Sequence, residues 1–199
     1  AYDSAEQLLK QDELDAVYIA TPVFTHSELT RLAADHGKHV LCEKPLGLNA
    51  DDALRTVEYC RKKGVLLSVD LMMRYGAHVN RVRKAVAAGE IGQVVSADAR
   101  FSCWVPKACW STDPGRAGGG PLMDMGIHLI DLLRYVTGLE VTAVTAMNER
   151  ISFPPEGYGV EDSSTVLMRM ENGAQCTVFT NFNIPDSAGK WTMNLFGTR

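Results

Sequence analysis

The residue types best suited to acid–base chemistry gather in the segment 118–131, which reads GGGPLMDMGIHLID. Asp124, His128 and Asp131 stand at positions i, i+4 and i+7, so one helix would present all three along a single face. Imidazole titrates close to neutral pH, and an imidazole near a carboxylate is typical of general acid–base catalysis. Pro121 suits a first helical turn, and the glycines before it predict a close approach of backbone and ligand.

Other interpretations of this segment remain open at this point. Gly126 lies inside the expected helix, where glycine costs about 1 kcal/mol relative to alanine, so a neighbour such as a substrate ring is expected to need the space. A polar stripe is also what a solvated helix face presents. The Asp-x-x-x-His spacing could supply two metal ligands, but zinc requires three or four and no nearby cysteine or glutamate completes a set. We therefore expect no metal.

The composition narrows the class of protein. The chain has 199 residues, of which 46% are hydrophobic and 22% charged, as in ordinary globular proteins with one or two cores. No apolar run approaches the roughly 18 to 20 residues that cross a bilayer, so we expect no membrane partner. The chain has 20 Lys and Arg residues and 24 Asp and Glu residues, which gives a net charge of −4 and argues against a nucleic-acid partner. Five cysteines without a C-x-x-C pair favour a reducing compartment, and we expect a cytoplasmic protein.

The first 70 residues alternate short apolar runs with helical segments. Strands are expected over 14–20, 39–42 and 65–69, and helices over 26–36 and 50–63. Ser4 and Gln7 form a candidate capping box at the start of a short helix that precedes the first strand. Asn49 and Gly64 are the candidate caps of the helix 50–63. This alternation predicts βαβ units and a parallel sheet that is covered on both faces.

After Asp70 the pattern changes to longer, alternating strands. A helix is expected over 80–88, and strands over 94–105, 141–149, 164–170, 175–182 and 191–196. In the first of these strands, Val95, Ala97 and Ala99 are expected on one side with Phe101 and Cys103. Asn172-Gly173 is a hairpin signal. The pattern predicts a mostly antiparallel sheet backed by a helix over 122–135, with a boundary that divides domain 1–73 from domain 74–199.

Further polar clusters follow the expected parallel strands. Glu43-Lys44-Pro45 lies at the C-terminal end of the second strand, where ligands bind in open parallel sheets. An exposed charge pair would explain Glu43-Lys44 about as well. Thr21-Pro22-Val23-Phe24-Thr25-His26 ends the preceding strand, although His26 alone is explained by a helix start. The ordered series T-P-x-x-x-H, E-K-P and G-G-G-x-L-x-D-x-G-x-H-x-x-D is hard to obtain by chance.

With these motifs, nearly the whole chain resembles the Gfo/Idh/MocA family of NAD(P)-dependent oxidoreductases, named for glucose-fructose oxidoreductase and inositol dehydrogenase. The resemblance implies an α/β fold, with the second half of a Rossmann-type parallel sheet followed by an α+β domain. It implies hydride transfer between NAD or NADP and a secondary alcohol or ketone of a sugar, polyol or related small molecule. The catalytic residues that it implies are Lys44, Asp124 and His128.

The resemblance also implies binding residues. The residues expected beside the nicotinamide and its ribose are Thr21, Pro22, His26, Glu43 and Lys44. Those expected at the substrate are Arg74, Tyr75, Trp110, Asp124 and His128. A proline that usually follows the family's segment at Met73-Arg74-Tyr75 is Ala77 here. Trp104, Trp110 and Arg116 are expected within reach of the same pocket, although at least one tryptophan is expected to be a core residue.

Two other functions compete with dehydrogenation. A branch of the family cleaves glycosides with tightly held NAD as a transient oxidant, and some regulators of similar fold sense nucleotides without turnover. The retention of Lys44, Asp124 and His128 argues against a sensor, which has no need of a proton relay. By resemblance, the sheet of the second domain is expected to form a homodimer or tetramer.

The largest departure from the family is the lack of a G-x-G-x-x-G motif, which holds the cofactor's pyrophosphate. At about 30 residues per βαβ unit, the expected missing part is roughly 60 to 70 residues. Residues 197–199 resemble a family segment that further elements follow. We therefore expect a fragment, in which missing strands or another chain cover the apolar edge at 17–19.

Overall fold

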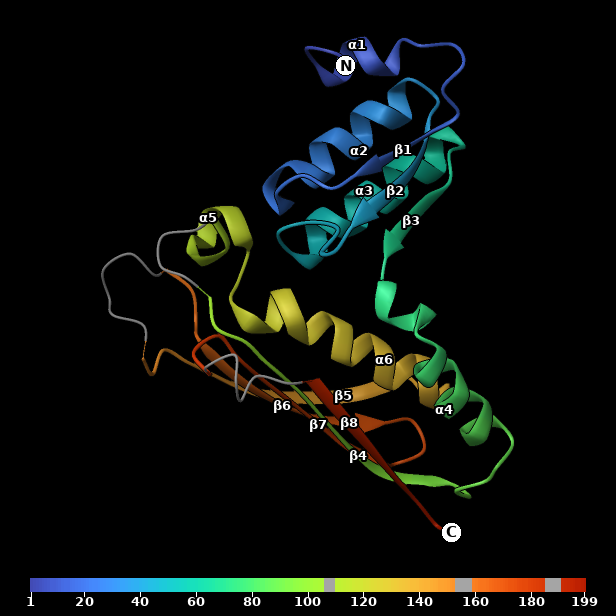
Figure 1. Ribbon diagram of the computed structural model, residues 1–199, viewed down its shortest axis with the longest axis vertical. Helices are drawn as coiled ribbons and strands as arrows, with labels where there is room; N and C mark the ends of the chain where they lie inside the picture. Colours follow the sequence, from blue (N-terminus) through green and yellow to red (C-terminus); the bar gives the residue numbers. More distant parts are fainter. Residues whose placement is uncertain (106–109, 153–158, 185–190) are drawn as a thin grey trace. The chain divides into compact units, whose positions relative to one another are not determined.

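The computed structural model describes residues 1–105, 110–152, 159–184 and 191–199 (Figure 1). It divides into two compact units. The first comprises residues 1–70 with 115–118, and the second comprises residues 71–114 with 119–199. Each unit has its own sheet and its own hydrophobic core. A parallel sheet followed by a mostly antiparallel one confirms the predicted fold class.

The first unit is built from βαβ crossovers. Its elements are α1 (Ala5–Leu9), β1 (Ala16–Ile19), a 3₁₀ turn (Val23–Thr25), α2 (His26–Asp35), β2 (His39–Glu43), α3 (Ala50–Lys63) and β3 (Leu67–Asp70). The strands are parallel in the order β1-β2-β3. The predicted caps are confirmed, since Ser4 Oγ accepts from the Gln7 N–H at 3.2 Å and Asn49 Oδ1 from that of Asp52 at 2.9 Å. Gly64 ends α3 in the left-handed region, with φ of 72°.

Both long helices of this unit pack on one face of its sheet. Ala33 of α2 and Ala53 of α3 share a core with Cys42 of β2. The strand order advances in one direction, and right-handed crossovers that advance in one direction place their helices on the same side. On the opposite face Tyr18 is 53% exposed and Leu41 is 40% exposed. Among the described residues, the prediction of a sheet covered on both faces is therefore wrong.

The second unit has a mixed sheet. Its helical elements are a 3₁₀ turn (Met72–Tyr75), α4 (Ala77–Ala87), a second 3₁₀ turn (Trp110–Thr112), a π-helical turn (Leu122–Gly126) and α6 (Ile127–Thr137). The short helix α5 (Pro114–Ala117) falls at the division between the units. The strands are β4 (Val94–Ser102), β5 (Val141–Glu149), β6 (Ser163–Met170), β7 (Gln175–Asn181) and β8 (Trp191–Gly197), in the order β5-β6-β7-β4-β8. Among the described strands of this second sheet, only the β4–β7 pairing is parallel.

Helix α6 lies along the face of this sheet, as Figure 1 shows. Leu129 and Leu133 of α6 are fully buried in one cluster with Ala99, Val166 and Val178 of the sheet. Full burial of a leucine side chain contributes roughly 1.5–3 kcal/mol, so these contacts hold α6 firmly on the sheet. The helix that carries His128 therefore stands on a rigid base.

One strand differs in detail from its predicted pattern. Ala97 and Ala99 of β4 are buried as predicted, but Val95 is 46% exposed. The pairing of β4 with β8 shifts register between Val94 and Ser96. Such an irregularity reverses the side on which the preceding residues lie, so Val94 is buried in place of Val95.

The described cysteines are free thiols. They are Cys42, Cys60, Cys103 and Cys176, whereas Cys109 lies outside the described residues. Burial raises the pKa of the Cys42 thiol to about 11. Within the ranges that the structure describes, no helix combines the length and the apolar character that crossing a bilayer requires.

Candidate active site

The parallel strands of the first unit bring polar residues to one edge. Glu43 at the end of β2 pairs in register with Asp70 at the end of β3, and Thr21-Pro22 follows β1. Lys44 comes directly after Glu43. Because these residues all stand at the carboxyl ends of parallel strands, they share the edge at which open α/β sheets bind ligands.

Tyr18, which belongs to none of the sequence motifs, also lies at this edge. The Tyr18 hydroxyl lies 2.7 Å from Glu43 Oε1 and 3.2 Å from Asp70 Oδ2. Its hydrogen bond to Glu43 is the first cause of the raised pKa of Tyr18, so this phenol stays protonated as a donor. Glu43 Oε2 also accepts from the Lys44 backbone N–H at 3.1 Å. The only sequence signal was a phenol within an otherwise apolar strand.

The Thr21–His26 segment forms a compact turn. The Thr21 and Thr25 hydroxyl oxygens lie 2.6 Å apart, and the Thr25 hydroxyl donates to the Pro22 carbonyl at 2.8 Å. Thr21 is exposed and can offer its hydroxyl to a ligand. His26 is only 2% exposed, with its ring nitrogens 2.8 Å from the Pro45 carbonyl oxygen and 2.7 Å from that of Thr21. The Thr21 hydroxyl is therefore accessible to a ligand, whereas the His26 ring is enclosed by protein.

The helix that carries Asp124 and His128 does not begin as a regular α-helix. Residues Leu122–Gly126 form a π-helical turn, and α6 follows from Ile127. The wider π turn breaks the uniform α-helical spacing that the i, i+4, i+7 prediction assumed between Asp124 and His128, and π turns are frequent at functional sites. His128 is 7% exposed and Asp124 is half-buried.

The third member of that series, Asp131, has a structural partner. The Arg74 Nε donates to Asp131 Oδ2 at 2.7 Å, and the Arg74 Nη2 donates to Asp131 Oδ1. The Arg74 guanidinium also lies 5.0 Å from the ring centroid of Tyr135. The Asp131 hydrogen bond raises the pKa of Arg74. Arg74, which was predicted at the substrate, thus joins the segment after β3 to helix α6.

The remaining predicted substrate residues are accessible. Tyr75 is 82% exposed and Trp110 is 40% exposed. Trp104 is 55% exposed and forms an isolated bridge with Asn183. The prediction that at least one of these tryptophans is a core residue is therefore wrong. In the first unit, the Arg116 guanidinium lies 4.6 Å from the ring centroid of Phe24.

The glycines of segment 118–131 accommodate neighbouring protein atoms. A Cβ at Gly118, whose φ is +76°, would lie 2.4 Å from the Leu48 carbonyl oxygen. At Gly120 it would lie 2.0 Å from the Glu161 carbonyl oxygen, and at Gly126 it would lie 2.6 Å from a methyl group of Leu122. Protein backbone and a flexible side chain therefore fill the space beside these glycines, where the sequence predicted a ligand or a substrate ring.

Two groups of the first unit could hold the nicotinamide end of a dinucleotide. The exposed Thr21 hydroxyl and the oriented Glu43 carboxylate are groups that suit a ribose and a carboxamide at the end of a parallel sheet. The sequence contains no G-x-G-x-x-G turn to hold the pyrophosphate. Thr21 and Glu43 are therefore candidates for the nicotinamide end of such a cofactor only.

The structure thus combines a Rossmann-type parallel sheet that has polar strand ends with a mixed sheet that is backed by the helical segment carrying Asp124 and His128. Residues 1–71 match the model of the oxidoreductase family, NAD-binding Rossmann fold, and residues 79–199 match that of the GFO/IDH/MocA C-terminal domain. The chain belongs to the GFO/IDH/MocA family. The predicted family and its nicotinamide cofactor are confirmed at this level.

Its relatives include enzymes that act on sugars and polyols. The chain is 34% identical over 189 residues to D-xylose 1-dehydrogenase (NADP(+)) 2 of Haloferax volcanii, covering 94% of this chain and 56% of the relative. It is 34% identical to myo-inositol 2-dehydrogenase of Thermotoga maritima, covering 87% and 52%. Levoglucosan dehydrogenase, in complex with NADH and levoglucosan, superposes with a TM-score of 0.92 at 26% identity, covering 99% and 55%. The chain thus spans about half the length of these relatives.

Proposed function

We propose that the protein is an NAD(P)-dependent dehydrogenase that transfers hydride between the nicotinamide ring and a secondary alcohol carbon. Its substrate is a sugar, a polyol or a related small molecule. Two of its relatives are named as dehydrogenases of such compounds, D-xylose and myo-inositol. The observation that carries this proposal is the combination of Lys44, Asp124 and His128 in a chain that both domain models of the family match.

The proposed mechanism assigns a role to each of these residues. A bound nicotinamide would supply the hydride acceptor for oxidation of the alcohol and the hydride donor for reduction of the ketone. His128 takes the hydroxyl proton as general base in oxidation and gives it back in reduction. Asp124 orients the His128 ring or binds a neighbouring substrate hydroxyl. The Lys44 amine shares the proton or polarises the substrate oxygen as an ammonium.

The proposed binding residues differ in how well their environments support them. Thr21, Pro22 and Glu43 stand at the strand ends of the first unit, where a nicotinamide riboside is expected. The exposed Tyr75 and Trp110 remain proposed substrate contacts. His26 is buried between backbone carbonyls and Arg74 is paired with Asp131, so their environments support positioning roles better than direct binding.

The substitution Lys44→Ala tests this mechanism. Removal of a group that takes part in proton transfer is expected to lower kcat by about 10²-fold or more. The measurement is steady-state formation of reduced nicotinamide with a panel of sugars and polyols and with each of NAD and NADP. Lys10→Ala, at an exposed position, is the matched control and should retain full turnover. Unchanged turnover in Lys44→Ala would remove this residue from the mechanism.

The same assay separates the competing functions. A glycoside hydrolase that uses NAD as a transient oxidant would release sugar without a net change in cofactor redox state. A nucleotide-sensing regulator would bind cofactor and neither reduce it nor consume substrate. The set Lys44, Asp124 and His128 argues against the regulator, which has no need of a proton relay, and the net change in cofactor redox state decides between the two enzymes.

Assembly and location complete the proposal. We propose a homo-oligomer that forms through the sheet face opposite α6, where Met147, Leu167 and Phe196 are 68%, 43% and 52% exposed. Met147 pairs with Thr165, which lies two residues before Leu167 and therefore on the same face of the sheet. The register from Leu167 across the sheet reaches Asn194, which lies two residues before Phe196 and therefore on that face as well. The three apolar side chains thus share one face. The free thiols of the described cysteines support a reducing, cytoplasmic location.

A further inference from the structure

The ring of His26 links two strand-end segments of the first unit. His26 is the first residue of α2, and its Nδ1 lies 2.8 Å from the Pro45 carbonyl oxygen while its Nε2 lies 2.7 Å from that of Thr21. With 2% exposure, the ring has both nitrogens occupied by backbone oxygens. It therefore has no nitrogen to offer a bound cofactor. The ring instead lies between the turn after β1 and the segment that carries Lys44, and its N–H donates to the carbonyl oxygen of Thr21 or of Pro45 according to the tautomer.

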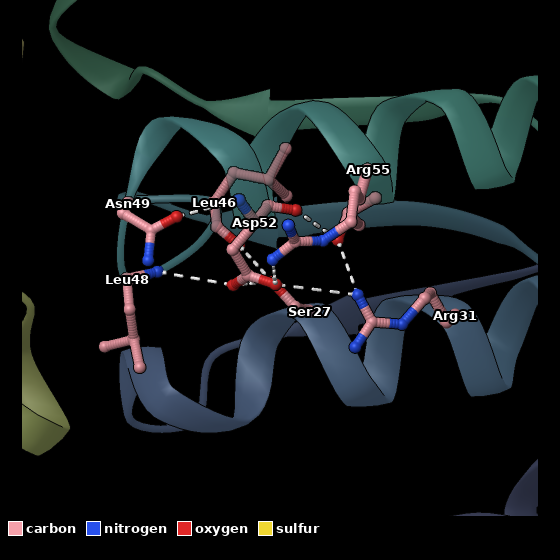
Figure 2. A network of polar contacts seen from close by, with 8 residues as sticks. Ser27, Arg31, Leu46, Leu48, Asn49, Asp52 and Arg55 are labelled. Atoms are coloured by element: carbon pink, nitrogen blue, oxygen red, sulfur yellow. Dashed lines mark hydrogen bonds and ion pairs between the residues drawn. The ribbon is translucent and has the colours of Figure 1, made fainter.

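The neighbouring Ser27 holds the same segment one residue further along. Its hydroxyl oxygen lies 2.5 Å from Asp52 Oδ2 and 3.5 Å from the Leu46 carbonyl oxygen. The Asp52 Oδ2 also accepts from the Leu48 N–H at 3.4 Å, and Figure 2 shows Ser27 and Asp52 directed at each other between α2 and α3. A Cβ at Gly47 would lie only 2.6 Å from Asp52 Oδ2, so the carboxylate lies directly against this backbone.

The three side chains come from regular elements, whereas the segment that they hold is irregular. His26 and Ser27 belong to the first turn of α2, and Asp52 belongs to the first turn of α3, which Asn49 caps. Residues 44–48, between β2 and α3, are neither helix nor strand. Hydrogen bonds from rigid neighbours are what fix such a segment, because it has no backbone ladder of its own.

We propose that His26, assisted by Ser27 and Asp52, positions Lys44 and does not contact the cofactor. We call these three side chains, His26, Ser27 and Asp52, the clamp. Its existence follows from the described geometry alone, whereas its effect on turnover rests on the proposed function of Lys44. A catalytic group must be held closely in its productive position, since a displacement of about 1 Å can cost 10²-fold in rate. His26 acts through the backbone carbonyl of Pro45, the residue that directly follows Lys44.

The test compares His26→Gln and His26→Ala with His36→Gln, which changes a histidine just after the other end of the same helix. The first readout is hydrogen exchange of the backbone amides of Lys44 and of residues 46–48, which needs no turnover; Pro45 has no amide proton. Loss of the His26 hydrogen bond is expected to speed this exchange about 10-fold, with exchange in β2 and α3 unchanged. The control variant is expected to exchange as the wild type does.

The second readout separates positioning from binding. The two His26 variants are expected to lower kcat by about 10- to 100-fold while the Kd of NAD or NADP stays within about 2-fold of wild type. Should His26→Ala not fold, Ser27→Ala removes a single hydroxyl and is expected to speed exchange at 44–48 in the same direction.

Two results would overturn the inference. One is unchanged exchange of residues 44–48 in the His26 variants. The other is a weakened cofactor Kd with unchanged kcat, which would make His26 a cofactor contact. A protein without any hydride transfer would instead contradict the proposed function, and the exchange measurement would still decide whether the clamp exists.

Discussion

His128→Ala is expected to lower kcat by about 10²- to 10⁴-fold, the range that a general acid–base group contributes. The Kd of the cofactor should change little, because the proposed proton transfer concerns the substrate hydroxyl. His128 is 7% exposed on helix α6, whose Leu129 and Leu133 are anchored in the core of the sheet. An alanine at 128 therefore removes the imidazole without moving the backbone that carries it.

Steady-state kinetics with a reactive sugar or polyol measure this effect, and thermal unfolding checks that the variant is folded. His78→Ala is the matched control in the same unit, since this exposed histidine contacts the Trp191 ring at 5.3 Å between centroids. It should retain wild-type kcat. A His128→Ala enzyme whose kcat falls by less than about 3-fold would exclude His128 as the general base.

Arg74→Met is expected to destabilise the protein by about 3–5 kcal/mol, because it leaves the Asp131 carboxylate buried without its cation. The Asp131 side chain is only 8% exposed, whereas that of Arg74 is 38% exposed. The opposite substitution, Asp131→Asn, leaves a guanidinium that reaches water and should cost less, about 1–3 kcal/mol. The double variant with Met at 74 and Leu at 131 should recover much of the loss.

Urea unfolding of these variants gives the free energies and their coupling. Arg134→Met is the matched control, because Arg134 lies on the same helix α6 as Asp131 and makes a bidentate pair with Glu140, which follows the helix, at 2.8 Å for both hydrogen bonds. That pair is exposed, with side chains at 43% and 62%, and its loss should cost less than about 1 kcal/mol. Equal losses at Arg74 and Arg134 would show that the Arg74–Asp131 pair has no special structural weight.

Local sequence signals predicted the local features of the fold. The capping residues Ser4 and Asn49 and the terminating Gly64 act within one helical turn, so their chemistry can be read from neighbouring positions. The parallel and antiparallel strands also followed from hydrophobic period. The register irregularity near Val95 did not, because it depends on how β4 pairs with β8, almost a hundred residues away.

The candidate site was predictable in its residue types and less so in their contacts. The bond of Tyr18 to Asp70 spans 52 residues and that of Arg74 to Asp131 spans 57, so no local spacing reveals either pair. The π-helical turn at Leu122–Gly126 was missed because the apolar period of the segment is compatible with an ordinary α-helix. His26 was assigned to the cofactor by its motif, while its burial depends on the fold.

The central claim is hydride transfer from an alcohol carbon to nicotinamide, and isotope transfer tests it most directly. The polypeptide, as its natural host makes it, is incubated with oxidised NAD or NADP and with sugars and polyols deuterated at the carbinol carbons. We predict that deuterium moves from carbon to the nicotinamide ring, with one ketone formed for each reduced cofactor, and that His128→Ala slows this transfer. Cofactor binding without any transfer of deuterium, across the whole panel and with both cofactors, would contradict the account.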